Sequence, residues 1–367
     1  MTLSRSWKDS FDWALFVAVA TLSVFGIVNL YSASSSLGPS FRDVYIQQIH
    51  WLTLGAGVAV LVAVIDYRYY ERYGWVAYGI GLALLVLVFL LGREVRGSQR
   101  WIPIGGFSLQ PSELMKIFLI IALAKHLHND PRTEGRTLKD LILPGAILAV
   151  PLVLVLVQPD LGTAMILVAI FVTIMFLTQL KLRSLITLVV TLLASAPLTW
   201  RYLLKDYQRD RLFAFMSPRE DLLGRGWHGH QAKVAIGSGG WTGKGFLGST
   251  QNQHRFLPDP HSDFPFSVWS EEHGFVGAVL LVGLYLFIVL WGLKIAAQAR
   301  DRFGAVVAVG VSAMFFSHAF VNLGMVLGML PVVGITLPLV SYGGSSVLTF
   351  LLGVGLLMNV SMRRHAF

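Results

Sequence analysis

The sequence predicts an all-α, polytopic membrane protein with ten transmembrane helices and a large extracytoplasmic loop between helices 7 and 8. Of its 367 residues, 55% are hydrophobic and only 13% are charged, whereas soluble domains carry about 25% charged residues. Apolar stretches recur from Asp12 to the C-terminal region, so one anchor or signal peptide does not account for them. These observations exclude a soluble globular protein and a disordered chain.

The spans follow from length and hydropathy, because a helix needs about 20 mostly apolar residues to cross the hydrocarbon core. The fourth span is interrupted by Glu113 and Lys116. We interpret residues 1–367 as one integral membrane domain, with residues 201–265 as its large loop. The predicted spans, in chain order, are Asp12–Tyr31, Gln48–Ile65, Gly74–Leu91, Pro111–Leu127, Leu141–Val157, Pro159–Leu177, Leu182–Trp200, Phe266–Trp291, Arg302–Leu330 and Pro338–Met362.

The distribution of positive charge predicts the orientation. An even number of spans places both termini on one side, and cytoplasmic segments are enriched in Lys and Arg. With the N-terminus inside, the short outer loops hold only Arg42, Arg93, Arg96 and Arg100, and most other basic residues outside the large loop are cytoplasmic. The net charge of +9 then reports orientation and anionic lipid headgroups, and it gives no reason to expect nucleic acid.

The sequence has no cysteine, which excludes disulfides, thiolate metal sites and a cysteine nucleophile. Its informative polar residues lie at the outer ends of the inward-running spans. Glu113, Asp160 and Asp263 fall at or just before spans four, six and eight, and Ser341 lies where span ten approaches the membrane. If these helices converge, four helix N-termini face one outward region, which favours anion binding.

Glu113 and Lys116 are three residues apart, so they share a helix face and can pair. The alternative is that Glu113 caps the first turn after Pro111, although the deeper Lys116 favours a polar cavity. Asp160 follows Pro159 in a similar pattern, with the same capping alternative.

Asp263 is the candidate general base, because a positioned carboxylate can accept a proton during reaction. The alternative role is an N-cap for span eight. His261 and Asp263 could also ligate a cation, although two ligands at this spacing are a weak metal signal.

The glycine-rich segment 237–245 resembles a phosphate-binding loop but lacks the Walker A pattern. Ser238 stands where that pattern has glycine, and Gly245 stands where it has serine or threonine. We expect the glycines to let the backbone approach a substrate or a neighbouring helix. Candidate phosphate contacts among the basic outer residues, with headgroup anchoring as the alternative for each, are Arg96, Arg100, Lys233 and Lys244.

This layout suits an amphiphilic substrate with an anionic head at the surface and a tail in the lipid, such as a polyprenyl-pyrophosphate sugar. An anion transporter would satisfy much of the same layout. Motifs along the chain resemble the SEDS (shape, elongation, division and sporulation) family of bacterial membrane proteins, and its elongation branch rather than its division branch. The motifs are Gly97–Ile102, Gln110–Lys116, Gln158–Thr163, Ala235–Gly240, Gly243–Gly245, Phe256–Phe264, Met329–Gly334 and Leu337–Gly344.

The resemblance implies a peptidoglycan glycosyltransferase that polymerises lipid II, the undecaprenyl-pyrophosphate-linked disaccharide-pentapeptide, into β-1,4 glycan during cell elongation. It implies Asp263 as the base, Glu113, Lys116 and Asp160 as cavity residues, and Arg100 as a pyrophosphate contact. It also implies a divalent cation, Mg²⁺ or Mn²⁺, for which the sequence indicates no site.

The partners implied by the resemblance are a class B penicillin-binding protein transpeptidase and other membrane proteins of the elongation complex. The implied location is the bacterial cytoplasmic (inner) membrane, with an active site on the extracytoplasmic side. Two alternatives stay open at this point, a lipid II flippase and a non-enzymatic scaffold of the elongation complex.

Overall fold

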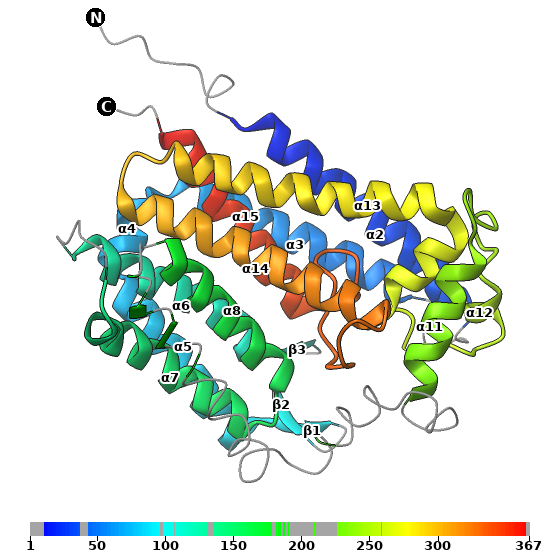
Figure 1. Ribbon diagram of the computed structural model, residues 1–367, viewed down its shortest axis with the longest axis horizontal. Coiled ribbons are helices and arrows are strands. Elements are labelled where there is room, and N and C mark those ends of the chain that lie inside the picture. The colour runs from blue at the N-terminus through cyan, green and yellow to red at the C-terminus, as the bar shows by residue number, and fades with distance from the viewer. Residues whose placement is uncertain are drawn as a thin grey trace, which may run out of the picture.

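The computed structural model is a bundle of long helices with a small sheet at one side and two shorter helices, α11 and α12, at one end (Figure 1). It describes residues 11–36, 43–95, 98–105, 107–130, 136–177, 226–257 and 259–364, with isolated positions between 181 and 209. The helices are α2 Trp13–Ser35, α3 Val44–Val64, α4 Tyr67–Arg72, α5 Gly74–Leu91, α6 Pro111–His128, η2 Leu138–Leu141, α7 Ile142–Val157, α8 Leu161–Leu177, α11 Gly226–Ser238, α12 Thr250–Gln253, α13 Pro265–Ala297, α14 Arg302–Val326 and α15 Gly344–Arg363.

Seven segments of the described chain are long and apolar enough to cross a membrane: α2, α3, α5, η2 with α7, α13, α14 and α15. The apolar helix α8 is shorter, and α6 carries three charged residues, Glu113, Lys116 and Lys125. Each predicted span overlaps one of these helices except Leu182–Trp200, which lies almost wholly outside the described residues, as does much of the 201–265 loop. The ten-helix count therefore stays a prediction.

The outer faces of these helices are apolar, as contact with lipid requires. Val60, Leu90 and Ile142 expose 64%, 75% and 71% of their surface. Helices α14 and α15 are instead mostly buried, and α14 packs against α6, α8 and α13 in the centre of the bundle.

Helices α3 and α15 pack closely because each places a glycine against the other helix. A Cβ at Gly55 would lie 2.5 Å from Leu351, and one at Gly355 would lie 2.7 Å from the Ala59 carbonyl oxygen. Glycines at such positions allow the helix backbones to approach each other in membranes.

The first and last described helices meet at one end of the bundle, opposite α11 and α12 (Figure 1). The Asp12 carboxylate accepts hydrogen bonds from Trp291 Nε1 at 2.9 Å and from Ser361 Oγ at 2.8 Å. These bonds join the start of α2 to the ends of α13 and α15. The two ends of the described chain therefore lie on the same side, as an even number of spans requires.

The sequence analysis missed a three-stranded antiparallel sheet, so the fold is mostly rather than entirely helical. Its strands are β1 Arg93–Val95, β2 Ser98–Ile104 and β3 Phe107–Leu109, in the order β1-β2-β3. The tight turn between β2 and β3 uses Gly105 at φ +52, a conformation that glycine adopts without steric cost. The sheet matters for function because it holds Arg100 and Trp101 beside the helix ends.

Helix α13 is kinked at Gly274, where φ is 66. The backbone of residues 240–245 bonds to the groups that the kink releases, with Lys244 N donating to Glu271 O at 3.0 Å and Phe275 N donating to Gly240 O at 2.8 Å. A Cβ at Gly243 would lie 2.0 Å from the Glu272 carbonyl oxygen. The glycine-rich segment thus approaches a neighbouring helix, one of its two predicted uses.

The last helix starts later than predicted, at Gly344 rather than Pro338. Residues 337–343 form a turn, in which Leu337 N donates to Ser341 Oγ at 2.8 Å and Leu339 has a φ of 63. If the helix began at Pro338, Leu337 N would lose the hydrogen bond that it donates to Ser341 Oγ. The late start leaves the N-terminal turn of α15 facing the interior.

Candidate active site at the converging helix starts

The starts of α6, α8, α13 and α15 surround one cavity of about 200 Å³. Strand β2 and the segment before α15 complete its wall. The lining residues are Arg100, Trp101, Gln110, Glu113, Asp160, Thr163, Ile166, Ser262, Asp263, His318, Gly334, Ile335, Thr336, Tyr342, Gly343, Ser345 and Ser346. Four of the sequence-predicted site residues, Arg100, Glu113, Asp160 and Asp263, are therefore brought together.

Glu113 and Lys116 form an ion pair in the first turns of α6. Lys116 Nζ lies 2.8 Å from Glu113 Oε2, and the lysine is fully buried. Pro111 stands at the start of the helix, where its missing N–H costs nothing. The three-residue spacing then places the carboxylate and the ammonium on one face.

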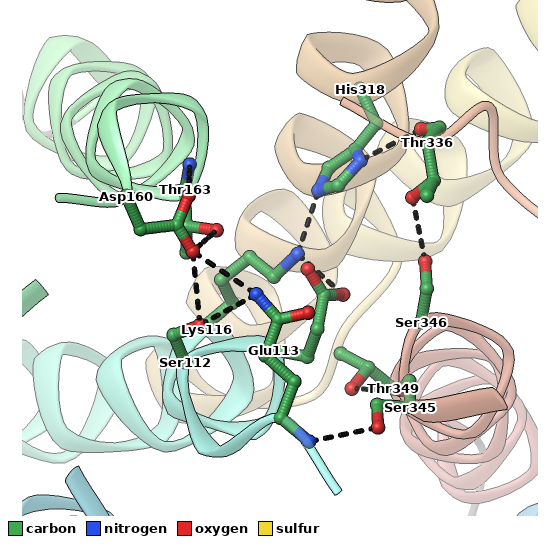
Figure 2. Close-up of polar contacts among 11 residues, drawn as sticks. Ser112, Glu113, Lys116, Asp160, Thr163, His318, Thr336, Ser345, Ser346 and Thr349 are labelled. Atoms are coloured by element: carbon green, nitrogen blue, oxygen red, sulfur yellow. Dashed lines mark hydrogen bonds and ion pairs between the residues drawn. The ribbon is translucent and has the colours of Figure 1, made fainter. Parts of the chain in front are cut away.

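A third residue completes this buried group, as Figure 2 shows. His318 Nε2 on α14 lies 2.8 Å from Lys116 Nζ, and His318 Nδ1 lies 3.1 Å from the Thr336 carbonyl oxygen. The Phe350 ring packs 5.8 Å from the ammonium. The lysine charge is therefore held by a carboxylate, an imidazole and an aromatic face.

Asp160 both caps a helix and lines the cavity. The sequence analysis treated these two roles as alternatives, and the residue has both. Its carboxylate accepts from Thr163 N at 3.2 Å, in the first turn of α8, and from Gln110 Nε2 at 3.0 Å (Figure 2). Arg100 Nη1 lies 3.6 Å away. Arg100 also donates to the carbonyls of Gln158 and Pro159, which fixes the guanidinium at the cavity wall.

Asp263 is half-buried in the cavity wall and does not cap α13. The residue before α13 is Phe264, and no side chain caps the first turn. Asp263 N donates to Asp259 O at 3.1 Å, and Asp263 O accepts from Asn322 Nδ2 at 3.1 Å. Backbone contacts on two sides therefore hold the residue and leave its carboxylate on the cavity side, next to Gly334.

His261 and Ser341 support the wall rather than line the cavity. The His261 carbonyl accepts from Tyr342 N at 2.8 Å, and its ring packs 6.2 Å from the Tyr342 ring. Ser341 holds the turn before α15 through Leu337 N. Both residues position Tyr342, which does line the cavity.

Lys244 lies elsewhere. Its Nζ donates to Glu271 Oε1 at 2.6 Å and to Thr250 Oγ1 at 2.8 Å. Glu271 is fully buried and also accepts from Ser249 Oγ at 2.6 Å. The ammonium therefore ties the 239–250 segment to α13, and the cavity wall does not include it. Of the other candidate phosphate contacts, Lys233 is not in the wall, and Arg96 lies outside the described residues.

The sequence analysis also missed His318 and Asn322 on α14 and Thr336 in the segment before α15. His318 and Asn322 are polar residues four apart in a mostly apolar span, and buried polar residues in spans are often functional. That signal was available in the sequence.

The described residues include no group of three or more His, Asp or Glu side chains placed to hold a metal ion. The cavity does offer carboxylate oxygens from Asp160 and Asp263. Mg²⁺ often binds through one or two carboxylates together with substrate phosphates, and these donors suit that mode.

The matches to known proteins cover nearly the whole chain. The FtsW/RodA/SpoVE family model, described as a cell cycle protein, matches residues 12–366. Peptidoglycan glycosyltransferase MrdB of Escherichia coli strain K12 is 38% identical over 358 residues, covering 97% of this chain and 95% of its own.

Two solved structures match closely. A chain from a peptidoglycan synthase complex, described as coordinating polymerization and crosslinking, has a TM-score of 0.84 at 34% identity over 97% of this chain and 99% of its own. The rod shape determining protein RodA of Thermus thermophilus has a TM-score of 0.73 at 32% identity over 97% of this chain and 98% of its own.

Proposed function

The chain belongs to the FtsW/RodA/SpoVE family of cell cycle proteins, and from that premise we infer that it is a peptidoglycan glycosyltransferase of the membrane. Its relative MrdB carries that activity in its name. Its substrate is lipid II, whose sugars lie at the surface while its polyprenyl tail stays in lipid.

One observation carries the proposal, the convergence of Asp263, Glu113, Asp160 and Arg100 on one cavity at the starts of four helices. Helix starts present unpaired N–H groups and a partial positive charge. Together with Arg100, they suit the pyrophosphate of the donor. The carboxylates supply proton acceptors within the same space.

In the reaction, the Asp263 carboxylate accepts the proton of the acceptor 4-hydroxyl as that oxygen attacks the anomeric carbon of the donor. The bond from that carbon to the pyrophosphate oxygen breaks, the configuration inverts, and undecaprenyl pyrophosphate leaves. Proton transfer to a positioned side chain contributes about 10²–10⁴ in rate. Asp263 suits this role because its backbone is fixed on both sides.

The Arg100 guanidinium lies in the cavity wall beside the leaving pyrophosphate, and the buried Lys116 adds positive charge behind that wall. Charge that is fixed before the reaction stabilises a developing anion without reorganisation. Asp160 orients Arg100, and Glu113 orients Lys116. Asp160 or Asp263, together with the pyrophosphate, would hold a Mg²⁺ or Mn²⁺ ion, and that ion would supply further charge neutralisation.

The cavity opens to the extracytoplasmic side in this account, with both termini in the cytoplasm of a bacterial cell. A lipid II flippase would need a path along the bundle. His318 lines the cavity, and Lys116 and Phe350 are buried behind it; this packing favours a closed site over a transport path.

The neighbouring structure comes from an assembly that combines polymerization with crosslinking. We extend this to a class B penicillin-binding protein as the partner of this chain. Under the scaffold alternative, variants of the cavity would still support that partner normally.

Polymerisation of lipid II by the purified protein with its transpeptidase, in the presence of moenomycin, tests the proposal. We expect glycan polymer from the wild type and none from Asp263→Ala. Asp259→Asn is the matched control, because Asp259 lies in the same segment at a φ of 42, which asparagine tolerates. Polymer from Asp263→Ala would remove the base role, and headgroup translocation in sealed vesicles without polymer would favour the flippase.

A further inference from the structure

Helix α14 presents two buried polar side chains, His318 and Asn322, to the segment that precedes α15. They are four residues apart and so lie on one helix face. His318 bonds to the Thr336 carbonyl, and Asn322 Nδ2 donates to the adjacent Ile335 carbonyl at 2.7 Å. The exposed fractions are 2% for His318 and zero for Asn322.

The contacts of His318 define one protonation state. An ammonium group only donates, so Nε2 must accept from Lys116. A carbonyl oxygen only accepts, so Nδ1 must donate to Thr336. Figure 2 shows the two contacts of the ring, and from them we infer a neutral ring with its proton on Nδ1. A charged ring could not accept from the lysine, and the other tautomer would reverse both bonds.

Asn322 connects different parts of the same wall. Its Nδ2 donates to the carbonyls of both Asp263 and Ile335, at 3.1 Å and 2.7 Å. One amide group therefore ties the segment before α13 to the segment before α15. Two side chains one helical turn apart on α14 therefore contact the two backbones: His318 contacts Thr336, and Asn322 contacts Asp263.

We propose that His318 and Asn322 are positioning residues that fix the Lys116 ammonium, buried behind the cavity wall, and the Asp263 carboxylate, in that wall, relative to each other. His318 acts through the lysine, and Asn322 acts through the backbone of Asp263. The group that accepts the proton and the group that stabilises the leaving group are therefore both held by helix α14. The proposal rests on the proposed function for its catalytic meaning.

Glutamine tests the role of His318, because its amide also combines one acceptor with one donor. We expect His318→Gln to keep the wild-type kcat to within about tenfold, since the two hydrogen bonds persist. His318→Leu, which has neither group, should lower kcat about 100-fold while leaving KM unchanged, because small misplacements have such effects. Asn322→Leu should behave as His318→Leu does.

The measurements are lipid II polymerisation by the complex with the transpeptidase and the melting temperature of each variant. Ser312→Ala is the control for a polar substitution in the interior of α14, because the Ser312 hydroxyl donates within its own helix, to Ala308 O at 2.8 Å. Wild-type kcat in folded His318→Leu, or equal losses in His318→Gln and His318→Leu, would overturn the proposal.

A second measurement does not depend on activity. The ¹⁵N spectrum of histidine-labelled protein, with the His318 signals assigned by their loss in His318→Gln, reports the tautomer directly. We expect the proton on Nδ1, and a proton on Nε2 would overturn the proposed contacts. If the wild type forms no polymer, the proposed function fails, while this spectrum still decides how Lys116 is held.

Discussion

Arg100 Nη1 lies 3.6 Å from Asp160 Oδ1, and this contact joins the sheet to the start of α8. Arg100 comes from β2, and its remaining donors reach the backbone just before α8. The guanidinium is partly exposed toward the cavity, with 27% of the side chain accessible. It is therefore held in place and still able to contact an anion.

We predict that Arg100→Lys raises the KM for lipid II about tenfold or more. Lysine keeps the charge but loses the planar donors that bind phosphate in a bidentate manner, and a hydrogen bond to a charged group contributes roughly 1.5–3 kcal/mol. Steady-state polymerisation kinetics measure the effect. An unchanged KM in a folded variant would assign Arg100 a structural role only.

The Glu113–Lys116 pair predicts a strong coupling between two substitutions. Removing one partner of a buried ion pair costs about 3–5 kcal/mol, because the other charge stays buried without compensation. Glu113→Gln and Lys116→Met should each lower the melting temperature, and the double variant should be more stable than the sum of the two losses predicts. Additive losses would show that the two residues act independently.

Lys244 gives a prediction that separates two roles. Because its ammonium bonds to Glu271 and is absent from the cavity wall, Lys244→Met should leave the KM for lipid II unchanged. Hydrogen exchange in residues 239–250 should become faster, since this segment loses a hydrogen bond between charged groups, worth roughly 1.5–3 kcal/mol. A raised KM without faster exchange would restore the phosphate contact that the sequence suggested.

Tyr67 predicts a pH effect at the other end of the bundle. Burial, together with the hydrogen bond from Tyr67 Oη to Asp301 at 2.6 Å, raises the pKa of Tyr67 from 10.0 to about 12. A raised pKa stabilises the fold fully below pH 10, and this contribution is lost as the pH rises toward 12.

The check compares the melting temperatures of the wild type and Tyr67→Phe across that range. The wild type should melt higher at neutral pH, and the difference should shrink as the pH rises from 10 to 12. A constant difference would mean that ionisation of Tyr67 does not contribute.

The sequence was sufficient for the apolar spans that the structure describes and for the grouping of the acidic residues. The long apolar runs predict the helices because lipid leaves the backbone few alternatives. Glu113, Asp160 and Asp263 could be grouped because each lies at the start of a span that the charge distribution predicts to run inward from the outer side. The structure places all three in one cavity wall.

Other features depend on contacts that local pattern does not encode. The sheet formed by residues 93–109 has strands of three to seven residues, too short for a clear alternation of polar and apolar positions. Lys244 pairs with Glu271, which is 27 positions away, so no local spacing links them. The late start of α15 depends on a tertiary turn, in which Tyr342 N bonds to the His261 carbonyl.

The most direct test of the central claim is the structure of Asp263→Asn with its transpeptidase and lipid II, determined by electron cryomicroscopy. Asparagine keeps the shape of the side chain but does not accept the proton, so substrate should remain bound. We predict the pyrophosphate beside Arg100 and the acceptor 4-hydroxyl within about 3.5 Å of the side chain at position 263. Lipid II bound away from the starts of α6, α8, α13 and α15 would contradict the account.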